Sequence, residues 1–452
     1  MIKPINNKKY IEKLLVSKRF DKVKNKFKNL HASEAAELIK EIEPEFQLAV
    51  YRLLPKKFTA KIFSYFEPSL QEFFISSLRT KEIIDLLAEI EPDDRTSLFE
   101  ELPEEIASPL LKLLNPNDLK QLKKIFSYPK ESVGRVMTPE FISVNSEWTA
   151  KETIDYIREK AKDKETIDVI YCTDNEGRLV REIPLSNLIL AKSDKKIKDI
   201  HVKPLVILSA FEDQEKAVYV IKKYNRTALP VVDPQSRLVG IVTIDDLMDI
   251  QEEETTEDFH KFGGVLSGKG DSVFMGNILD ASVIFLYKHR IFWLMLLIFV
   301  NIFSGAAIAR FEEVIARSLV LVLFLPLLID SGGNAGSQAA ILMVRALGTG
   351  DVKIKDWFKL IKRELIISLL LGITMAFGAG AIGAIRGGQQ IALVVGISMI
   401  LIVVSGSLIG MSLPFIFTKL KRDPASASGP LVTSIADISG VIIYFSIANF
   451  IL

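Results

Sequence analysis

Residues that could bind a cation occur together in an otherwise apolar stretch of the C-terminal half. The run "LLIDSGGNAGSQAAIL", residues 327–342, places Asp330, Asn334 and Gln338 at intervals of four. On a continuous helix these side chains share one face near the middle of the stretch. Carboxylate and amide oxygens, with no thiolate or imidazole, suit a hard divalent cation. Magnesium in particular keeps several waters and binds through few carboxylates, although calcium, manganese and cobalt would accept the same oxygens.

A second polar face is predicted in the last apolar run, where Pro430, Thr433, Asp437 and Tyr444 fall on one side of a helix. An unpaired carboxylate at the bilayer centre costs roughly 2.5–3.5 kcal/mol on insertion scales, so it normally faces a polar cavity and marks an ion or substrate path. We therefore expect Asp437 and Asn334 to line one passage. The structural alternative is a network of hydrogen bonds that only joins helices.

Small residues accompany this chemistry. Gly332, Gly333 and Gly336 follow Asp330, and we expect them to leave room for a hydrated ion. Another set recurs at every fourth position of 365–385, where it would let a neighbouring helix approach closely. That set is Gly372, Ala376, Gly380 and Ala384.

The elements that would hold these residues are membrane spans. The chain has 452 residues, a net charge near +1 and 49% apolar residues, and from residue 291 onward the charged residues form short islands. Five apolar stretches reach the length of about 20 residues that crosses a bilayer. They are 290–309, 316–344, 365–385, 390–417 and 424–452. Basic islands follow the second and fourth stretches, which predicts a cytosolic N-terminal half and an outside C-terminus.

Other compositional signals exclude several classes of protein. The N-terminus lacks the pattern of a cleaved signal peptide. A single cysteine, Cys172, excludes an intrachain disulfide, and the four histidines have no metal-ligand spacing. There is no "GxxxxGK" phosphate-binding loop and no paired-cysteine metal site. We expect no enzymatic activity and no nucleic-acid partner.

The first 130 residues contain an internal repeat. Pro44, Pro68, Pro92 and Pro116 recur with a period of 24, and "EIEPEFQLAVYRLLP" returns as "EIEPDDRTSLFEELP". This periodicity predicts stacked helical hairpins in which each proline opens a helix. The predicted core positions between hairpins are Leu38, Ile42, Leu86, Leu87 and Ile90. Asp93, Asp94, Glu104 and Glu105 would then lie at helix beginnings, where the helix dipole explains acids without any metal.

A second duplication follows. "DNEGRLVREIPLSNLI", residues 174–189, aligns with "DPQSRLVGIVTIDDLM", residues 233–248, and the order of strand, turn, strand and helix predicts two small α/β modules. "GIVTIDDLM" resembles the end of cystathionine-β-synthase-type (CBS) modules. The resemblance implies that Thr243 and Asp246 contact the ribose of an adenine nucleotide such as ATP. The first copy, "REIPLSNLI", lacks both residues, so one site per pair is the most that it allows.

The segment "DDLMDIQEEETTEDFHKFGG" after the second module is strongly acidic. Like charges at helical spacing oppose the helix unless cations bridge them. A solvated linker and a metal-bridged helix are both open. The acids on one helical face are Asp246, Asp249, Glu253 and Glu257, with Glu254 and Asp258 alongside.

The order of these parts resembles the MgtE family of magnesium channels and transporters over nearly the whole chain. The shared motifs include "EPDDR", "ELPEE", "EEETTEDFHKFGG", "DSGGNAGSQ", "RALGTGDV" and "DPASASGPLVTSIADISG". The resemblance implies a multidomain membrane protein with an all-α helical-repeat domain, tandem α/β CBS modules and five transmembrane helices. The corresponding boundaries are 1–130, 131–195 and 196–252 for the cytosolic domains, 253–285 for an acidic connecting (plug) helix, and 286–452 for the transmembrane domain.

The resemblance further implies a homodimer in the plasma membrane that takes up Mg²⁺, with Asp437 as the selectivity aspartate. Cytosolic Mg²⁺ would bridge acids of the three cytosolic parts and close the pore. The implied sensor residues are Asp246, Asp249, Glu254, Glu257 and Asp258, with Asp93 or Asp94. The implied pore residues are Asp437, Asn334, Asp330, Thr433, Gln338 and Gly429. Gly429 stands where some members have Asn, and Thr433 where some have Ala.

Other functions compete with this interpretation. A cation-coupled divalent metal exporter, or a less selective Mn²⁺/Co²⁺/Mg²⁺ transporter, could use the same passage. An intramembrane aspartyl hydrolase would also bury two carboxylates, Asp330 and Asp437, but the usual Gly-x-Gly-Asp signature is absent. A membrane-tethered nucleotide sensor leaves Asp437 unexplained.

Overall fold

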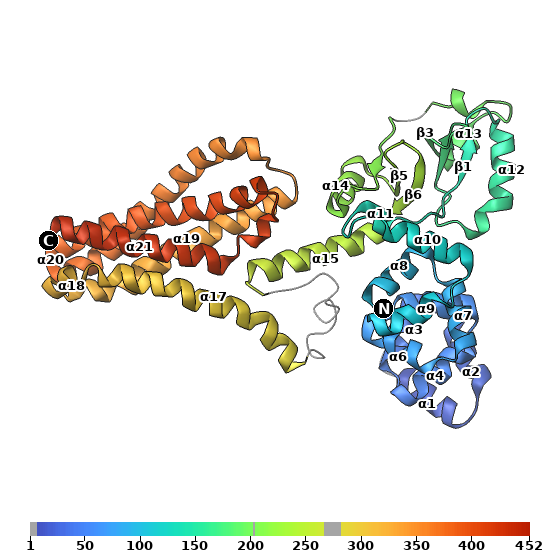
Figure 1. Cartoon of the computed structure of the whole chain (residues 1–452), viewed down its shortest axis with the longest axis horizontal. Coiled ribbons are helices and arrows are strands. Elements are labelled where there is room, and N and C mark those ends of the chain that lie inside the picture. The colour runs from blue at the N-terminus through green and yellow to red at the C-terminus, as the bar shows by residue number, and fades with distance from the viewer. Residues whose placement is uncertain (1–6, 202–203, 266–281) are drawn as a thin grey trace. The chain divides into compact units, whose positions relative to one another are not determined.

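The computed structural model describes residues 7–201, 204–265 and 282–452. It divides into two compact units, Met1–Glu252 and Glu253–Leu452. In Figure 1 the first unit runs from blue to green and the second from yellow to red.

Short helices pack side by side in the first part of unit 1. Pro44, Pro68, Pro92 and Pro116 are the first residues of α4, α6, α8 and α10, which confirms the predicted proline positions. Proline suits this position because its fixed φ matches the helix and its missing N–H would have no partner there. The helices are α1 (Asn7–Val16), α2 (Phe20–Phe27), α3 (Ala32–Glu41), α4 (Pro44–Leu53), α5 (Lys56–Ser64), α6 (Pro68–Ser77), α7 (Thr80–Glu89), α8 (Pro92–Glu101), α9 (Glu104–Leu111) and α10 (Pro116–Phe126).

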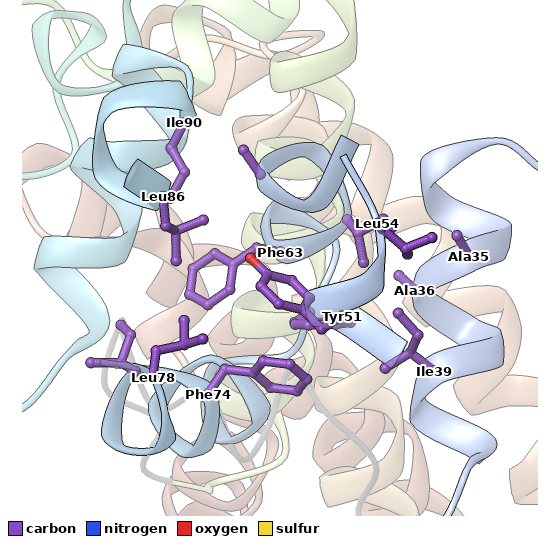
Figure 2. Packing of buried hydrophobic residues seen from close by; sticks show 14 of the residues in the cluster. Ala35, Ala36, Ile39, Tyr51, Leu54, Phe63, Phe74, Leu78, Leu86 and Ile90 are labelled. Atoms are coloured by element: carbon purple, nitrogen blue, oxygen red, sulfur yellow. The ribbon is translucent and has the colours of Figure 1, made fainter. Parts of the chain in front are cut away.

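An apolar core runs between these helices. Figure 2 shows Tyr51, Phe63, Phe74 and Leu86 pointing toward one another, and the rings of Tyr51 and Phe74 meet edge-on with centroids 4.9 Å apart. The five core positions predicted from the repeat are all buried, which confirms their packing between helices.

Two α/β modules complete unit 1. Each module has the order of strand, strand and helix that the duplication predicted. Its central strand pairs parallel to one neighbour and antiparallel to the other. An ion pair of 2.7 Å between the nearly buried Glu182 and Arg226 joins the modules. The first has β1 (Ser143–Asn145), α12 (Ala150–Lys160), β2 (Val169–Thr173), β3 (Leu179–Pro184) and α13 (Leu185–Leu190); the second has β4 (Leu208–Ser209), α14 (Gln214–Tyr224), β5 (Ala228–Val232) and β6 (Leu238–Thr243). Short helical turns lie at α11 (Val133–Val136), η2 (Ala161–Asp163) and η3 (Ile197–Asp199).

The acidic segment is helical from an earlier residue than the predicted connecting helix, 253–285. Helix α15 (Ile244–Phe262) begins directly after β6, so the last helix of the second module continues without a break into the acidic run. Residues 266–281 of the predicted connecting segment lie outside the described residues.

The described part of unit 2 contains four helices long and apolar enough to cross a membrane. They are α17 (Val283–Ala309), α19 (Val320–Gly348), α20 (Trp357–Lys419) and α21 (Gly429–Ile451). Between them lie α18 (Glu312–Arg317), η5 (Ile354–Asp356) and η6 (Pro424–Ser426).

Helix α20 contains both spans predicted at 365–385 and 390–417, and its non-helical break at Gly388 lies between them, which confirms their division. With 63 residues it would extend about 95 Å if it were straight, about three times the bilayer core. Gly388 breaks it with φ 77° and ψ −172°. A Cβ on Gly372 or Gly383 would lie 3.0 Å from the Cα of Ile400 or Ala392, so the two halves pack against each other. Four long helices therefore provide five crossings among the described residues.

The glycines of α19 serve helix packing, which corrects their expected role of making room for an ion. A Cβ on Gly332 would lie 2.5 Å from the side chain of Ile402, and one on Gly336 would lie 2.8 Å from the carbonyl oxygen of Gly406. Both glycines therefore hold α19 close to α20. Gly333 faces α21 instead.

Candidate functional site

The polar residues of α19 lie on one exposed face of that helix. Asp330, Asn334 and Gln338 are exposed, whereas the glycines beside them are buried. Asn334 Nδ2 donates a hydrogen bond of 3.0 Å to Asp330 Oδ2. The predicted spacing is therefore confirmed, and the amide supports the carboxylate of its neighbour.

Helix α21 brings Asp437 and Thr433 to the adjoining side of α19. A Cβ on Gly333 would lie 3.4 Å from Asp437 Oδ1 and 3.3 Å from the Thr433 methyl group. Asp437 is half-buried, and its carboxylate is close enough to that of Asp330 for their charges to repel. The two helices thus bring an amide and two carboxylates together beside Thr433, whose hydroxyl donates a hydrogen bond of 3.0 Å to the carbonyl oxygen of Pro430.

Tyr444 does not belong to this polar face. It is fully buried, and its hydroxyl donates a hydrogen bond of 2.9 Å to the carbonyl oxygen of Leu321, near the start of α19. It still lies on the same side of the continuous helix α21 as Asp437, as predicted, but its part of that side packs in the core and is not polar. Tyr444 fixes α21 to α19, which helps to position Asp437.

A second group of acids lies where the helical repeats meet the second CBS module, within unit 1. Burial, followed by repulsion from Asp246 and Asp94, holds the pKa of Asp93 well above its ordinary range. Burial raises the pKa of Asp246 to about 6, and repulsion from Asp245 and Asp94 adds to this rise. The structure therefore brings together Asp93, Asp94 and Asp246.

Glu165 joins this group although the sequence gave no reason to select it. Burial raises the pKa of Glu165 to about 7, with additional repulsion from Glu91 and Asp246. It follows η2 in an irregular segment, outside any acidic run or helical spacing. Only the folded chain places it against α8 and α15, so no signal in the sequence could have identified it.

Thr243 and Asp246 are adjacent, as the CBS resemblance implied. Thr243 Oγ1 donates a hydrogen bond of 2.6 Å to Asp246 Oδ2, and Thr243 is buried. Asp249, one turn further along α15, has a raised pKa because of burial and then repulsion from Glu252.

The end of α15 forms a separate charged group within unit 2. Lys261 Nζ lies 2.6 Å from Glu257 Oε1 and 2.5 Å from Asp423 Oδ2. Burial raises the pKa of Asp258 to about 6, repulsion from Asp423 adds to this rise, and Lys261 opposes it. Asp423 and Lys261 were not selected from the sequence. Glu254 is half-buried on the same helix.

The end of α15 also contacts the beginning of α21. A Cβ on Gly429 would lie 3.4 Å from the ring of Phe262, and one on Gly264, where φ is +69°, would lie 3.1 Å from Pro430 Cγ. Gly429 therefore lies at a junction with the connecting helix, two turns before Asp437. A movement of the end of α15 would reach the helix that carries Asp437.

Each of these groups offers few protein ligands to a cation. Among the described ranges, no three His, Cys, Asp or Glu side chains converge as a metal site. Pairs of carboxylates with hydroxyl and amide oxygens suit an ion that keeps part of its water, as magnesium does.

Comparisons with known proteins agree with this division of the chain. The family model described as "Divalent cation transporter" matches residues 325–447, the "MgtE intracellular N domain" matches 30–131 and the "CBS domain" matches 197–253. The "Magnesium transporter MgtE" of Thermus thermophilus is 34% identical over 94% of this chain and 93% of its own length. That of Bacillus subtilis is 32% identical over 75% of this chain and 74% of its own.

A solved structure, the soluble part of a magnesium transporter, matches 56% of this chain and 99% of its own, with 26% identity and a TM-score of 0.53. The resemblance seen in the motifs is thus confirmed by a relative that aligns over nearly the full length. The chain belongs to the MgtE family of magnesium transporters.

Proposed function

We propose that this chain carries Mg²⁺ into the cell through a passage lined by α19 and α21. The observation that carries the proposal is the convergence of Asp437 and Thr433 on the side of α19 next to Asp330 and Asn334. A lone carboxylate pair with neutral oxygens attracts a hydrated divalent ion and still releases it. Gln338 and Gly429 line the same route toward the end of α15.

Two copies of the chain would complete the passage. Asp330, Asn334 and Gln338 are exposed in the single chain, and contact of a carboxylate with lipid is costly. A homodimer that places the polar faces around a shared axis removes the carboxylates from lipid.

We further propose that unit 1 is cytosolic, that Leu452 is outside, and that the boundaries given above separate the domains. The basic islands 353–363 and 419–422 support this orientation by the positive-inside rule.

Cytosolic Mg²⁺ would close the passage by binding the two acid groups. Asp93, Asp94, Asp246 and Asp249 repel one another in unit 1, and Glu254, Glu257 and Asp258 lie beside Asp423 in unit 2. A divalent ion relieves this repulsion only where the acids are held together, so it favours that state through differential affinity. The end of α15 would transmit the change to α21.

An adenine nucleotide such as ATP is the proposed ligand of the second CBS module. The CBS family match and the adjacent Thr243 and Asp246 support this site. Loss of ATP binding by Thr243→Val, with unchanged thermal stability, tests it.

Uptake of Mg²⁺, Mn²⁺ and Co²⁺ into reconstituted vesicles tests the passage. We expect Asp437→Asn to reduce Mg²⁺ uptake at least about tenfold, as for loss of a metal-orienting group. Asn301→Leu, which removes an exposed amide from α17, is the matched control. Equal uptake by Asp437→Asn and wild type would refute the passage, and uptake that requires a sodium or pH gradient would favour the coupled exporter.

A further inference from the structure

The first two helices of unit 1, α1 and α2, form a strongly basic hairpin. Residues 7–28 contain nine Lys or Arg and two acids, a net charge of +7, whereas the whole chain has +1. The match to the MgtE intracellular N domain begins at residue 30, after the end of α2. The basic hairpin therefore precedes the part of the chain that matches this domain.

Both helices of the basic hairpin bury an apolar face and expose their basic residues. The buried side belongs to the core of the helical repeats and consists of Ile11, Leu14, Leu15, Val23 and Phe27. On α1, Lys9, Lys13 and Val16 are exposed and follow one another at intervals of four and three, so they share one face. On α2, Phe20 and Lys24 are exposed and lie one turn apart. Basic and apolar side chains thus alternate on the outer surface of the hairpin.

Eight of the nine basic side chains form no ion pair within the described ranges. The ninth, Lys8, lies 3.9 Å from Glu12. The eight are Lys9, Lys13, Lys18, Arg19, Lys22, Lys24, Lys26 and Lys28. A concentrated surface charge of one sign attracts a partner of the opposite sign, so this surface fits an anionic partner.

The turn between α1 and α2 presents basic and apolar side chains together. Val16 is 71% and Phe20 43% exposed, and the exposed Lys18 and Arg19 lie between them. The backbone N–H of Arg19 donates a hydrogen bond of 2.9 Å to the carbonyl oxygen of Leu14, which closes the turn. Exposed apolar groups beside Lys and Arg are the combination that binds the interface of an anionic bilayer.

An anionic bilayer fits this surface better than a nucleic acid or a second copy of the chain. Nucleic-acid surfaces combine basic residues with rings that stack on bases, and Val16, the most exposed apolar residue of the hairpin, has no ring. A symmetric contact with a second copy would bring the same positive charges together. A bilayer is always near, because unit 2 of the same chain contains the membrane-crossing helices and a covalent link raises the effective concentration.

We propose that the basic hairpin binds the phosphate headgroups of anionic lipids in the bilayer that holds unit 2. Val16 and Phe20 enter the headgroup region, and the surrounding Lys and Arg residues contact lipid phosphates. Each basic residue near an anionic surface strengthens such binding roughly fivefold. The contact holds the helical repeats at the membrane surface, and it involves neither the acids that face Asp246 nor the passage.

Fluorescence quenching by lipids in full-length protein tests this contact. The fluorophore nitrobenzoxadiazole is attached to Val16→Cys, while the buried Cys172 stays unlabelled. The protein is placed in nanodiscs of phosphatidylcholine alone, or of equal parts of phosphatidylcholine and phosphatidylglycerol, each with doxyl-labelled phosphatidylcholine as quencher. We expect quenching only with phosphatidylglycerol, and its loss in about 1 M salt, where the Debye length is about 3 Å.

Two pairs of substitutions in the labelled protein separate a specific surface from net charge. Arg19→Gln with Lys22→Gln should weaken the equilibrium for membrane contact roughly twentyfold, because two charges are lost, and so remove most of the quenching. Lys120→Gln with Lys123→Gln, which removes two exposed charges from α10, is the matched control and should be quenched like the unsubstituted labelled protein. All four positions are exposed, so the thermal midpoints should agree.

Three results would overturn the proposal: no quenching in either lipid, equal quenching in both, or equal quenching in the two paired variants. Single-stranded RNA that alters the fluorescence when lipid does not quench it would assign the surface to nucleic acid and also overturn the proposal. The nanodisc has the same lipids on both sides, so the result does not depend on the proposed orientation. Mg²⁺ uptake tests the passage separately, so the two proposals can fail independently.

Discussion

The acid group of unit 1 and the polar site of α19 and α21 use carboxylates in different ways. In unit 1, Asp93, Asp246 and Glu165 come from three different elements and raise one another's pKa on top of the effect of burial. In unit 2, Asp437 lies beside a threonine, and Asp330 accepts a hydrogen bond from Asn334. Acids from three elements crowd together in the first case, whereas in the second only two carboxylates approach each other, and each has a neutral polar residue beside it.

This difference has a physical reason. Crowded acids destabilise their own arrangement until a cation arrives, so cation binding can change which conformation is favoured. A transport site must attract an ion and then release it, which too many carboxylates would prevent. We infer that the unit 1 acids act through their mutual repulsion, whereas the passage works with few carboxylates.

The largest expected effect is loss of folded protein when the packing of α19 against α20 is disrupted. Gly336→Leu places a side chain where even a Cβ would lie 2.8 Å from the carbonyl oxygen of Gly406. Overpacking typically costs about 1–3 kcal/mol and more against backbone, so we expect loss of the monodisperse peak in size-exclusion chromatography.

The control for this change is Gly305→Leu, because a Cβ there meets nothing within 4 Å. If the Gly336→Leu protein eluted as the same monodisperse peak as the wild type, α19 and α20 could not be packed as described.

A smaller effect, on thermal stability, is expected from neutralising two of the unit 1 acids. A ligand at 100 times its Kd stabilises a fold by about 2.7 kcal/mol, so Mg²⁺ should raise the thermal midpoint of the wild-type cytosolic transition. Asp93→Asn with Asp246→Asn should raise the midpoint without Mg²⁺ and remove most of the Mg²⁺-dependent increase. Asp155→Asn, an exposed acid on α12, should keep it; a full increase in the double variant would contradict the sensor.

The smallest expected effect is a pH dependence of the same transition. The pKa values of Asp246 and Glu165, about 6 and about 7, exceed their ordinary 3.8 and 4.5. The folded state therefore binds protons more tightly than the unfolded state, and its stability falls as pH rises from about 4 to 7. In Mg²⁺-free buffer the thermal midpoint should be higher at pH 5.5 than at pH 7.5.

Glu165→Gln should reduce this difference, because it removes one of the two groups. A midpoint that instead rises with pH in both proteins would show that these acids are not crowded.

Local patterns predicted more of the fold than of the site. Proline spacing located α4 to α10, and the interval of four placed Asp330, Asn334 and Gln338 on one face, because such regularities survive folding. The break at Gly388 falls in the gap between the predicted spans 365–385 and 390–417, although a hydropathy pattern cannot show that a single residue, and not a loop, makes the turn. Glu165, Lys261 and Asp423 became neighbours of the acids only through tertiary packing, which leaves no mark in the local sequence.

Mg²⁺ would close the membrane passage by relieving the repulsion among the acids of α8 and α15, and one flux measurement tests this directly. Mg²⁺ entry into vesicles is measured while free Mg²⁺ on the unit 1 side is raised, for the wild type and for Asp246→Asn with Asp258→Asn. The account predicts that entry through the wild type falls steeply and that entry through the variant stays nearly constant. Equal inhibition of both proteins would contradict it.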